Sequence, residues 1–248
     1  MLPEIPHEQV QIAVEAIARE TLAEAVVTSP PVDALLLAER LGLVVARDAD
    51  GETRARFVRL GGTAVGAQET ILLADDPRPE RRQWAVAHEI GETRAHCVFT
   101  HLGVDPVEAP VSAREAVANR LAGCLLLPRD WFASAGVELD WDLIEMKHRF
   151  NTASHELIAR RMLEMPLPVI ITLADQGRTA WRASNRHFRP PPLTPAERDA
   201  WRAAHELGRA ARCESRELPE EVDDIRAWPI HEPDWRREIV RTALADQW

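Results

Sequence analysis

One mostly apolar helical segment, predicted from about Glu80 to Cys97, constrains this chain more than any other feature. Its centre reads Trp-Ala-Val-Ala-His-Glu-Ile-Gly-Glu over residues 84–92, so an imidazole and two carboxylates interrupt its buried side. Residues four positions apart lie on one helix face, which places His88 and Glu92 side by side. His-Glu occurs five times in the chain, but only His88 is followed four positions later by a plausible metal ligand.

The segments around this helix predict a mixture of helices and short strands, and hence an α+β protein. Further helices are predicted at 7–27, 31–42, 113–127, 142–150, 154–165, 195–212 and 235–244. Strands are predicted at 43–46, 55–60, 70–74, 169–173, 179–183 and 225–230, and the fourth and fifth of these form a hairpin. Ser112 is expected to cap the helix that follows it, with Glu115 as its capping-box partner.

Composition and charge narrow the classes of function. The 248 residues carry a net charge of −10, which argues against a general binder of duplex DNA. Cysteines at 97, 124 and 213 form no close pair, which argues against a disulfide scaffold or a CxxC metal site. The first residues lack the pattern of a signal peptide, and the longest apolar run, Pro166–Ala174, is too short to cross a bilayer. We therefore expect a cytoplasmic protein with no membrane contact.

The helix predicted from Glu80 to Cys97 and the helix predicted at 113–127 suggest a metal centre. A hydrolytic zinc takes three protein ligands and keeps a fourth position for water. His88 and Glu92 would be two of the ligands, and Glu89, which points about 100° away, would take the proton of the water. Glu115, 27 residues after His88, is the best candidate for the third ligand.

Other assignments remain open for these residues. His96 and His101 compete with Glu115 for the role of third ligand, although His96 lies two turns beyond His88. A carboxylate at 92 makes the site more negative and richer in oxygen, which lessens the preference for zinc and favours manganese or iron. The helix can also be an ordinary solvated amphipathic helix, with Glu115 as a cap partner only.

Two stretches resemble the ImmA/IrrE family of metallopeptidases. The segment Val86–Glu92 is similar to the xxAHEIGH helix of that family, and Glu115–Pro128 is similar to its E-x-x-A-N-x-F-A-x-x-L-L-x-P helix. The upstream segments Leu37–Val45 and Ile71–Ala74 also fit, as does His96, where the family often keeps a histidine. The likeness covers about residues 30–165, and it departs at 92, where the family has histidine.

The resemblance implies a zincin-like fold with a subdomain similar to a helix-turn-helix. It implies a zinc ion held by His88, by the residue at position 92, here Glu92, and by Glu115, with Glu89 as the base. The carboxylate at 92 leaves manganese or iron as the alternative ions. We expect a zincin-like metallopeptidase domain at 1–128, a helical subdomain at 129–166 and a small α+β extension at 167–248. The implied activity is a metal-dependent endopeptidase that cuts a helix-turn-helix repressor, releasing genes of a mobile element or a stress response.

Two other functions stay open. The chain can be a catalytically silent relative that binds a partner protein through the same cleft. It can also be a DNA-binding regulator that uses residues 142–165, although the net charge disfavours direct binding of nucleic acid. The exposed bases of that segment would be Lys147, His148, Arg149, Arg160 and Arg161.

Several isolated residues and one basic segment have both a functional and a structural interpretation. Residues 178–189 contain four arginines and no acid, which suits single-stranded nucleic acid or an acidic peptide, but equally a hairpin edge protected by charge. Cys97 and Cys124 are expected to be inert thiols on helices. The remaining histidines at 187, 205 and 231 lack partners at useful spacing and are expected to be ordinary surface or linker residues.

Overall fold

The computed structural model describes residues 5–48, 54–60, 68–186, 188–213 and 218–245. The chain forms two compact units. Unit 1 comprises Met1–Trp141 and Met146–Ser154, and unit 2 comprises Asp142–Glu145 and His155–Trp248. Residues of the segment 129–166 belong to both units, and the three-part division expected from the sequence stays a prediction.

Unit 1 contains a three-stranded mixed sheet. It is built from β1 (Val44–Asp48), β2 (Ala55–Leu60) and β3 (Gln68–Ala74), in the order β1-β3-β2. β1 runs parallel to β3 and β2 runs antiparallel to it. Because β3 lies in the centre, β1 and β2 are the edge strands of this sheet. The strands predicted at 43–46, 55–60 and 70–74 are confirmed within a few residues.

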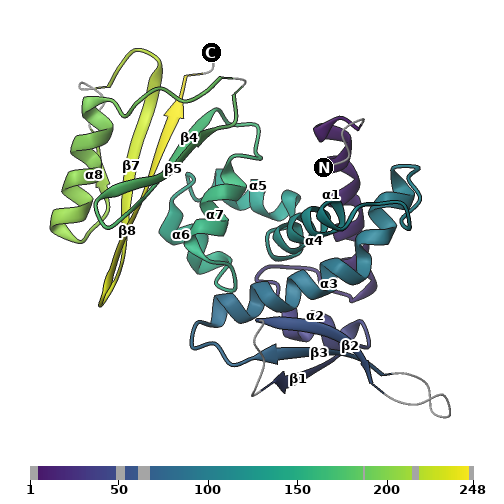
Figure 1. Cartoon of the computed structure of the whole chain (residues 1–248). Coiled ribbons are helices and arrows are strands. Elements are labelled where there is room, and N and C mark those ends of the chain that lie inside the picture. The colour runs from purple at the N-terminus through teal and green to yellow at the C-terminus, as the bar shows by residue number, and fades with distance from the viewer. Residues whose placement is uncertain (1–4, 49–53, 61–67, 187, 214–217, 246–248) are drawn as a thin grey trace. The chain divides into compact units, whose positions relative to one another are not determined.

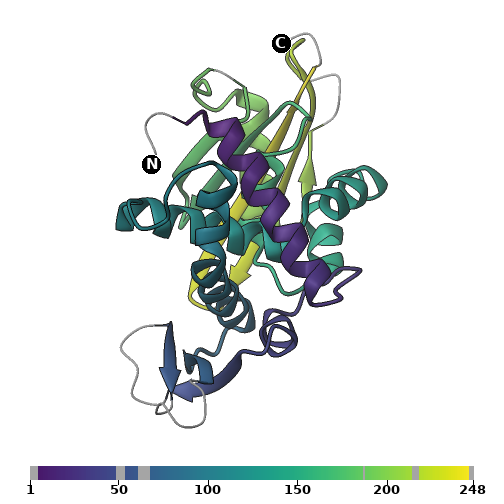
Figure 2. The same cartoon turned by 90° about the vertical axis from the view of Figure 1, so that its right-hand side faces the viewer.

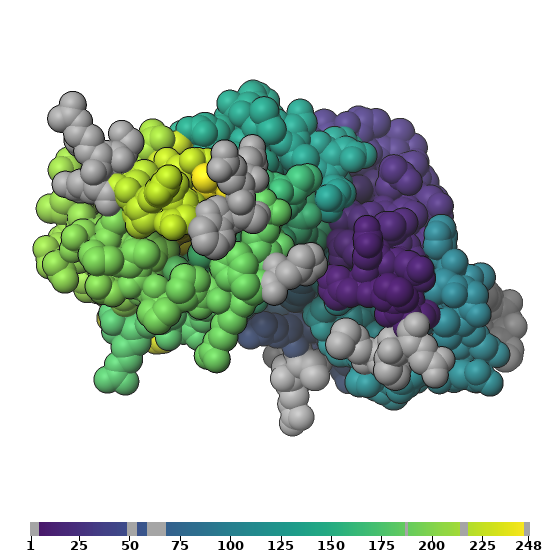
Figure 3. Space-filling view, turned by 90° about the horizontal axis from the view of Figure 1, so that it is seen from above, coloured from purple at the N-terminus to yellow at the C-terminus, as the bar shows by residue number. Residues whose placement is uncertain are grey.

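Three long helices pack together in unit 1. They are α1 (His7–Glu24), α3 (Pro79–His101) and α4 (Val111–Leu126), and the short α2 (Ala34–Arg40) also contacts α3. Figure 1 shows α3 running across one face of the small sheet, and Figure 2 shows α1 along its whole length. The solvent-facing side of α1 is visible in purple in Figure 3. The predicted core helix therefore lies between the sheet and the other helices.

Side-chain hydrogen bonds connect the start of α2 to α3. Asp33 caps α2, because its carboxylate accepts hydrogen bonds from the backbone N–H groups of Leu35 and Leu36. Gln83 of α3 donates to the same carboxylate oxygen at 3.0 Å, and its own oxygen accepts from the N–H of Ala34 at 2.6 Å. These bonds hold the first turns of α3 beside α2.

The start of α4 differs from the sequence prediction. Pro110 stands at the N-cap, the helix begins at Val111, and no side chain caps it. The capping box predicted for Ser112 and Glu115 is therefore wrong. The backbone carbonyl of Pro110 already accepts hydrogen bonds from the N–H groups of Ala113 and Arg114, so the helix begins before the serine. The carboxylate of Glu115 is left available for other contacts.

A helix missed by the sequence analysis, α5 (Arg129–Glu138), follows directly after α4. Pro128, taken only as the end of one helix, is the N-cap of the next. Proline is well suited to both places because it ends one run of hydrogen bonds and presets the backbone for another. In the same unit, Phe132 of α5 packs against the rings of Trp141 and Phe150. Helices α6 (Leu143–Arg149) and α7 (His155–Met162) complete the middle of the chain.

Unit 2 is built on a five-stranded antiparallel sheet. Its strands are β4 (Val169–Asp175), β5 (Arg178–Ser184), β6 (Ala211–Arg212), β7 (Val222–Glu232) and β8 (Trp235–Leu244), in the order β5-β4-β8-β7-β6. The predicted hairpin is confirmed as β4 and β5, and its turn places Gln176 and Gly177 at positive φ. Glycine tolerates that conformation without strain, which explains the tight turn.

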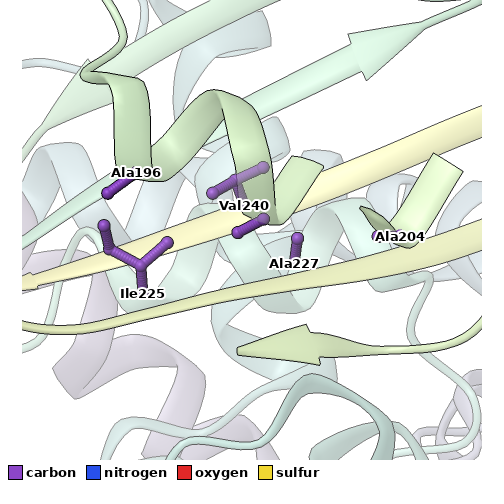
Figure 4. Close-up of a cluster of buried hydrophobic side chains, with 6 residues drawn as sticks. Ala196, Ala204, Ile225, Ala227 and Val240 are labelled. Atoms are coloured by element: carbon purple, nitrogen blue, oxygen red, sulfur yellow. The ribbon is translucent and has the colours of Figure 1, made fainter. Parts of the chain in front are cut away.

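Helix α8 (Pro195–Leu207) covers part of this sheet. Thr194 and Glu197 form a complete capping box at its start, and Gly208 ends it in the left-handed conformation. Its buried face consists of alanines at every fourth position, which lets the helix approach the strands closely. Figure 4 shows these alanines against side chains of β7 and β8, and the buried cluster contains Ala196, Ala200, Ala204, Ile225, Ala227 and Val240.

The predicted last helix at 235–244 is wrong, because this segment is the strand β8 in the centre of the sheet. β8 pairs with β4 along one edge and with β7 along the other, and Ile239 through Leu244 are all buried. A short run that contains both apolar and charged residues is ambiguous between helix and strand, and the β-branched Ile239, Val240 and Thr242 favour the strand.

The described ranges contain no helix that is both long and apolar enough to cross a bilayer.

Candidate metal centre

Three side chains of unit 1 converge between α3 and α4. His88 and Glu92 come from neighbouring turns of α3, and Glu115 comes from α4. Nε2 of His88 lies 3.6 Å from Oε1 of Glu92 and 3.6 Å from Oε1 of Glu115. One potential ligand atom from each residue lies within 4.8 Å of the other two. The structure thus brings together the three residues that the sequence analysis proposed as ligands.

A glycine allows the two helices to approach this closely. A Cβ atom added to Gly91 would lie 2.6 Å from the carbonyl oxygen of Ala118 on α4. Only a residue without a side chain fits there, so α4 passes directly over the turn of α3 that carries His88 and Glu92. The contact brings Glu115, one turn before Ala118, to the face that holds the other two side chains.

The distances suit one divalent ion. Ligand atoms of a tetrahedral ion with bonds of about 2.0–2.1 Å lie roughly 3.3 Å apart, close to the two observed separations. The side chain of His88 is 16% exposed, and those of Glu92 and Glu115 are 46% and 53% exposed, so solvent reaches the carboxylates. Asn119 donates a hydrogen bond of 3.0 Å to the oxygen of Glu115 that faces His88, which helps to orient that carboxylate. The donor set therefore fits an ion with a preference for nitrogen and oxygen ligands.

The imidazole of His88 has one unusual feature. Its Nδ1 atom is buried and has no hydrogen-bond partner among the described residues. A histidine that binds a metal through one nitrogen usually donates a hydrogen bond from the other, which fixes the ring. Among the described residues no group accepts such a hydrogen bond from Nδ1 of His88.

Glu89 lies on the buried side of α3, next to the ligand pair in sequence. It is 5% exposed, and its Oε2 atom is buried without a hydrogen-bond partner in the described part of the chain. Burial raises the pKa of Glu89, and the negative charge of Glu92 raises it further. His88 and a hydrogen bond from the backbone N–H of Phe57 on β2 act in the opposite direction but do not cancel the rise. A carboxylate with a raised pKa is a better proton acceptor than an ordinary one.

The competing histidines lie outside this cluster. His96 is exposed, and its Nδ1 atom hydrogen-bonds with the carbonyl oxygen of Thr93 at 2.8 Å. His101 is exposed at the end of α3, which is one turn longer than predicted. Cys124 is buried, and its sulfur accepts a hydrogen bond of 3.9 Å from Nε2 of Gln11.

A cavity of about 470 Å³ opens beside the cluster. Its lining combines apolar residues from the start of the sheet with polar residues of α3 and includes Leu41, Leu43, Phe57, Glu69, Glu92 and His96. Glu92 therefore belongs both to the candidate metal centre and to a hollow that is large enough for a few side chains.

Most of the bases proposed to read DNA are engaged within the protein. Lys147 donates to Glu80 at 2.8 Å and to two backbone carbonyls, and Arg149 pairs with Glu138. Arg160 pairs with Glu156 and lies over the ring of Trp181, and Arg161 is buried beside Glu164. The prediction of exposed bases is wrong for Lys147 and Arg161, whose side chains are largely buried, whereas Arg160 is exposed as predicted. Acidic partners inside the protein neutralise part of the positive charge that this segment would offer to DNA.

The basic hairpin at 178–189 is only partly available for binding. Arg182 is largely buried, and its guanidinium makes two hydrogen bonds to Glu197, at 2.8 and 3.1 Å. Arg178, Phe188 and Arg189 are exposed. The binding site for nucleic acid or an acidic peptide therefore stays a prediction. His187 lies outside the described residues.

The expectation that His205 and His231 lack partners is wrong. Both imidazoles contact one carboxylate, that of Glu238 on β8, which is completely buried. This cluster lies in unit 2 and is a second group that can hold a metal ion among the residues the structure describes. No sequence spacing reveals it, because its members come from α8, β7 and β8.

A family model covers the part of the chain that contains the first cluster. The model of the peptidase M78 family, described as the IrrE N-terminal-like domain, matches residues 38–163, which is half of the chain. The chain belongs to this family. The recognised resemblance and the expected α+β, zincin-like fold class are thereby confirmed.

Two other comparisons accompany this result. A comparison with curated proteins finds no match. A solved structure of a Mycobacterium tuberculosis transcriptional regulator is similar in fold, with a TM-score of 0.62 and 17% sequence identity. The match covers 96% of this chain and 81% of that one, so the fold is shared across both units.

Proposed function

We propose that the chain is a metal-dependent endopeptidase that cuts a regulatory protein of the repressor type. The observation that carries the proposal is the position of His88, whose Nε2 atom lies 3.6 Å from carboxylates of two different helices. A buried carboxylate with a raised pKa, Glu89, is the next residue in the sequence. Membership in a peptidase family supports the same function.

His88, Glu92 and Glu115 would hold the ion through one nitrogen and two carboxylates. When bound, the ion supplies a Lewis acid that lowers the pKa of water and polarises the peptide carbonyl. Glu89 takes the proton of the attacking water and then delivers it to the nitrogen of the leaving amine. Its burial supports this role, because a desolvated carboxylate holds a proton more readily and gives it up where no bulk water competes.

We propose zinc as the ion, with manganese or iron as the alternatives. Two carboxylates and one imidazole make the site more negative than a set with two imidazoles. This donor set weakens the preference for zinc over harder ions.

Two features support a protein substrate. The cavity beside Glu92 offers apolar walls from Leu43 and Phe57, which suits side chains of a peptide. The strand β2 lies at the edge of its sheet, and an extended peptide can pair with such an edge through backbone hydrogen bonds. The structural neighbour is titled a transcriptional regulator, which is in keeping with a role in regulation.

The proposal is tested with Glu89→Gln and His88→Ala in the full chain. The purified parent is loaded with zinc, manganese or iron and incubated with peptides that tile helix-turn-helix repressor domains, and products are identified by mass spectrometry. Glu89→Gln should keep its metal and lose cleavage by about 10²–10⁴ in rate, because only the base is removed. His88→Ala should lose most of its metal, because two carboxylates alone make a poor site.

Three outcomes contradict the proposal. Full cleavage by Glu89→Gln would refute the mechanism, and an unchanged metal content in His88→Ala would refute the assignment of the ligands. No cleavage by the parent with any of the three metals, together with binding of one of the peptides, would instead support the catalytically silent relative. His101→Ala, which removes an exposed imidazole outside the cluster, serves as the control and should behave like the parent.

A further inference from the structure

The carboxylate of Glu238 is the centre of a second cluster, in unit 2. Its Oε1 atom lies 2.8 Å from Nδ1 of His205 on α8 and 2.7 Å from Nε2 of His231 on β7. Three elements of the unit therefore direct one nitrogen or oxygen atom each to the same point. The two imidazole rings lie 5.9 Å apart, between centroids, and are nearly perpendicular.

The orientation of Glu238 is fixed by its other oxygen. The indole N–H of Trp201 donates a hydrogen bond of 3.0 Å to Oε2, which leaves Oε1 to face the imidazoles. Trp201 lies one turn before His205 on α8, so the same helix face supplies both contacts. A carboxylate held on its far side in this way is typical of a metal ligand with a supporting hydrogen bond.

The carboxylate of Glu238 is buried and needs partners. Its side chain is 0% exposed, and a buried carboxylate is costly unless it is paired. Burial raises the pKa of Glu238, but hydrogen bonds from Trp201, His231 and His205 outweigh burial and lower the pKa below its usual value. Both imidazoles direct a ring nitrogen to the same buried carboxylate oxygen.

We infer that His205, His231 and Glu238 form a binding site for a divalent metal ion of the zinc class. Two imidazoles and one glutamate are a typical donor set for zinc, which then keeps one position open. The side chains of His205 and His231 are 31% and 23% exposed, so an ion reaches them from solvent. This site depends on none of the residues of the centre between α3 and α4.

Binding of zinc requires the two contacts with Glu238 to lengthen. Ligands of a tetrahedral zinc lie roughly 3.3 Å apart, so the separations of 2.8 and 2.7 Å from Glu238 have to grow by about 0.5 and 0.6 Å. Each ring also has to carry its proton on the nitrogen that faces away from the ion. The same contacts describe a cluster that is held by hydrogen bonds alone, and the experiment has to separate the two.

The test counts zinc ions in the full chain. Protein stripped with a chelator is titrated with zinc against a competing chromophoric chelator, and bound zinc is measured by elemental analysis after dialysis. Because the proposed peptidase centre also binds zinc, the decisive background is His88→Ala. In that background the second variant is His231→Gln, whose side-chain amide keeps a hydrogen-bond donor for Glu238 but is a poor zinc ligand.

The inference predicts two zinc ions in the parent, one in His88→Ala, one in His231→Gln and none in the double variant. His101→Gln, the matched loss of an isolated imidazole, should equal the parent. A zinc content of zero in His88→Ala, or equal contents in His88→Ala and the double variant, would overturn the site. One zinc in both the parent and His88→Ala, with none in His231→Gln, would support this site and refute the peptidase centre.

Folding of the variants is checked separately. Far-ultraviolet circular dichroism and the thermal midpoint without metal show whether His231→Gln keeps its structure. His205→Gln, on the helix instead of the strand, is the second variant and should lower the zinc affinity at least tenfold. If both variants fold like the parent and bind zinc as tightly in the His88→Ala background, the cluster is an ordinary hydrogen-bonded group.

Discussion

Replacement of Gly91 by alanine tests the close approach of α3 and α4 on which the metal centre depends. The added Cβ would lie 2.6 Å from the carbonyl oxygen of Ala118 and 3.2 Å from its Cα, whereas real contacts of a Cβ stay above 3.0 Å. The obstacle is backbone and cannot rotate away. The helices therefore have to separate until the shortest contact grows from 2.6 Å to at least 3.0 Å.

Two opposing terms determine the effect on stability. Overpacking of a close contact costs about 1–3 kcal/mol. Alanine is favoured over glycine inside a helix by about 0.8–1.0 kcal/mol, which offsets part of that cost. We expect Gly91→Ala to lose about 0–2 kcal/mol of unfolding free energy, and each kcal/mol lowers the melting midpoint by about 2–4 °C in a chain of this size.

The assay combines thermal unfolding with a zinc titration. Ser134 is exposed in α5, so the difference in stability between Ser134→Ala and Ser134→Gly measures the helix-propensity term without a steric contact. Gly91→Ala should fall short of that gain, and it should also bind zinc more weakly because Glu115 moves with α4. The reasoning is refuted if Gly91→Ala is more stable than the parent by the full difference measured at Ser134 and binds zinc as tightly as the parent. In that case the close contact between α3 and α4 would not be what positions Glu115.

Two further substitutions extend these tests. Glu92→His should tighten zinc binding and give equal or higher peptidase activity, because the site loses one negative charge and gains a softer ligand; an unchanged affinity in a chelator competition would leave Glu92 without a ligand role. Asp175→Asn should destabilise the protein by about 1.5–3 kcal/mol at pH 7, since Asp175 accepts hydrogen bonds of 2.6 and 2.9 Å from Arg237. The hydrogen bond from Arg237 lowers the pKa of Asp175, so this stability is present above the unfolded-state pKa of about 3.9 and is lost as pH falls through the lower folded value. Urea unfolding at neutral and acidic pH measures the difference, and a gap between parent and variant that stays constant below pH 4 would contradict it.

Local periodicity was enough to place much of unit 1. The helical repeat puts His88 and Glu92 on one face of α3, and strand-like runs place the three strands before it. The position of Glu115 next to them depends on how two helices cross, which in turn depends on Gly91. A glycine in a helix does not reveal in the sequence which backbone will pass over it.

Long-range contacts explain what the sequence analysis missed. The local pattern of segment 235–244 is ambiguous between helix and strand, and its pairing with β4 and β7 selects the strand. Because that strand was predicted to be a helix, Glu238 had no partner, and His205 and His231 were treated as isolated. Pro110 likewise moves the start of α4, and the apparent capping box at Ser112 disappears with it.

The order of the strands in unit 2 has a consequence for synthesis on the ribosome. β8 is the last of them to be made, yet it lies in the middle of the sheet, between β4 and β7. Until Trp235–Leu244 emerges, β4 and β7 each expose an unpaired edge, whereas the sheet of unit 1 is complete once β3 has been made. Unit 2 therefore closes late, and a message truncated before codon 235 yields a chain with two open edges of the kind that attract chaperones or aggregate.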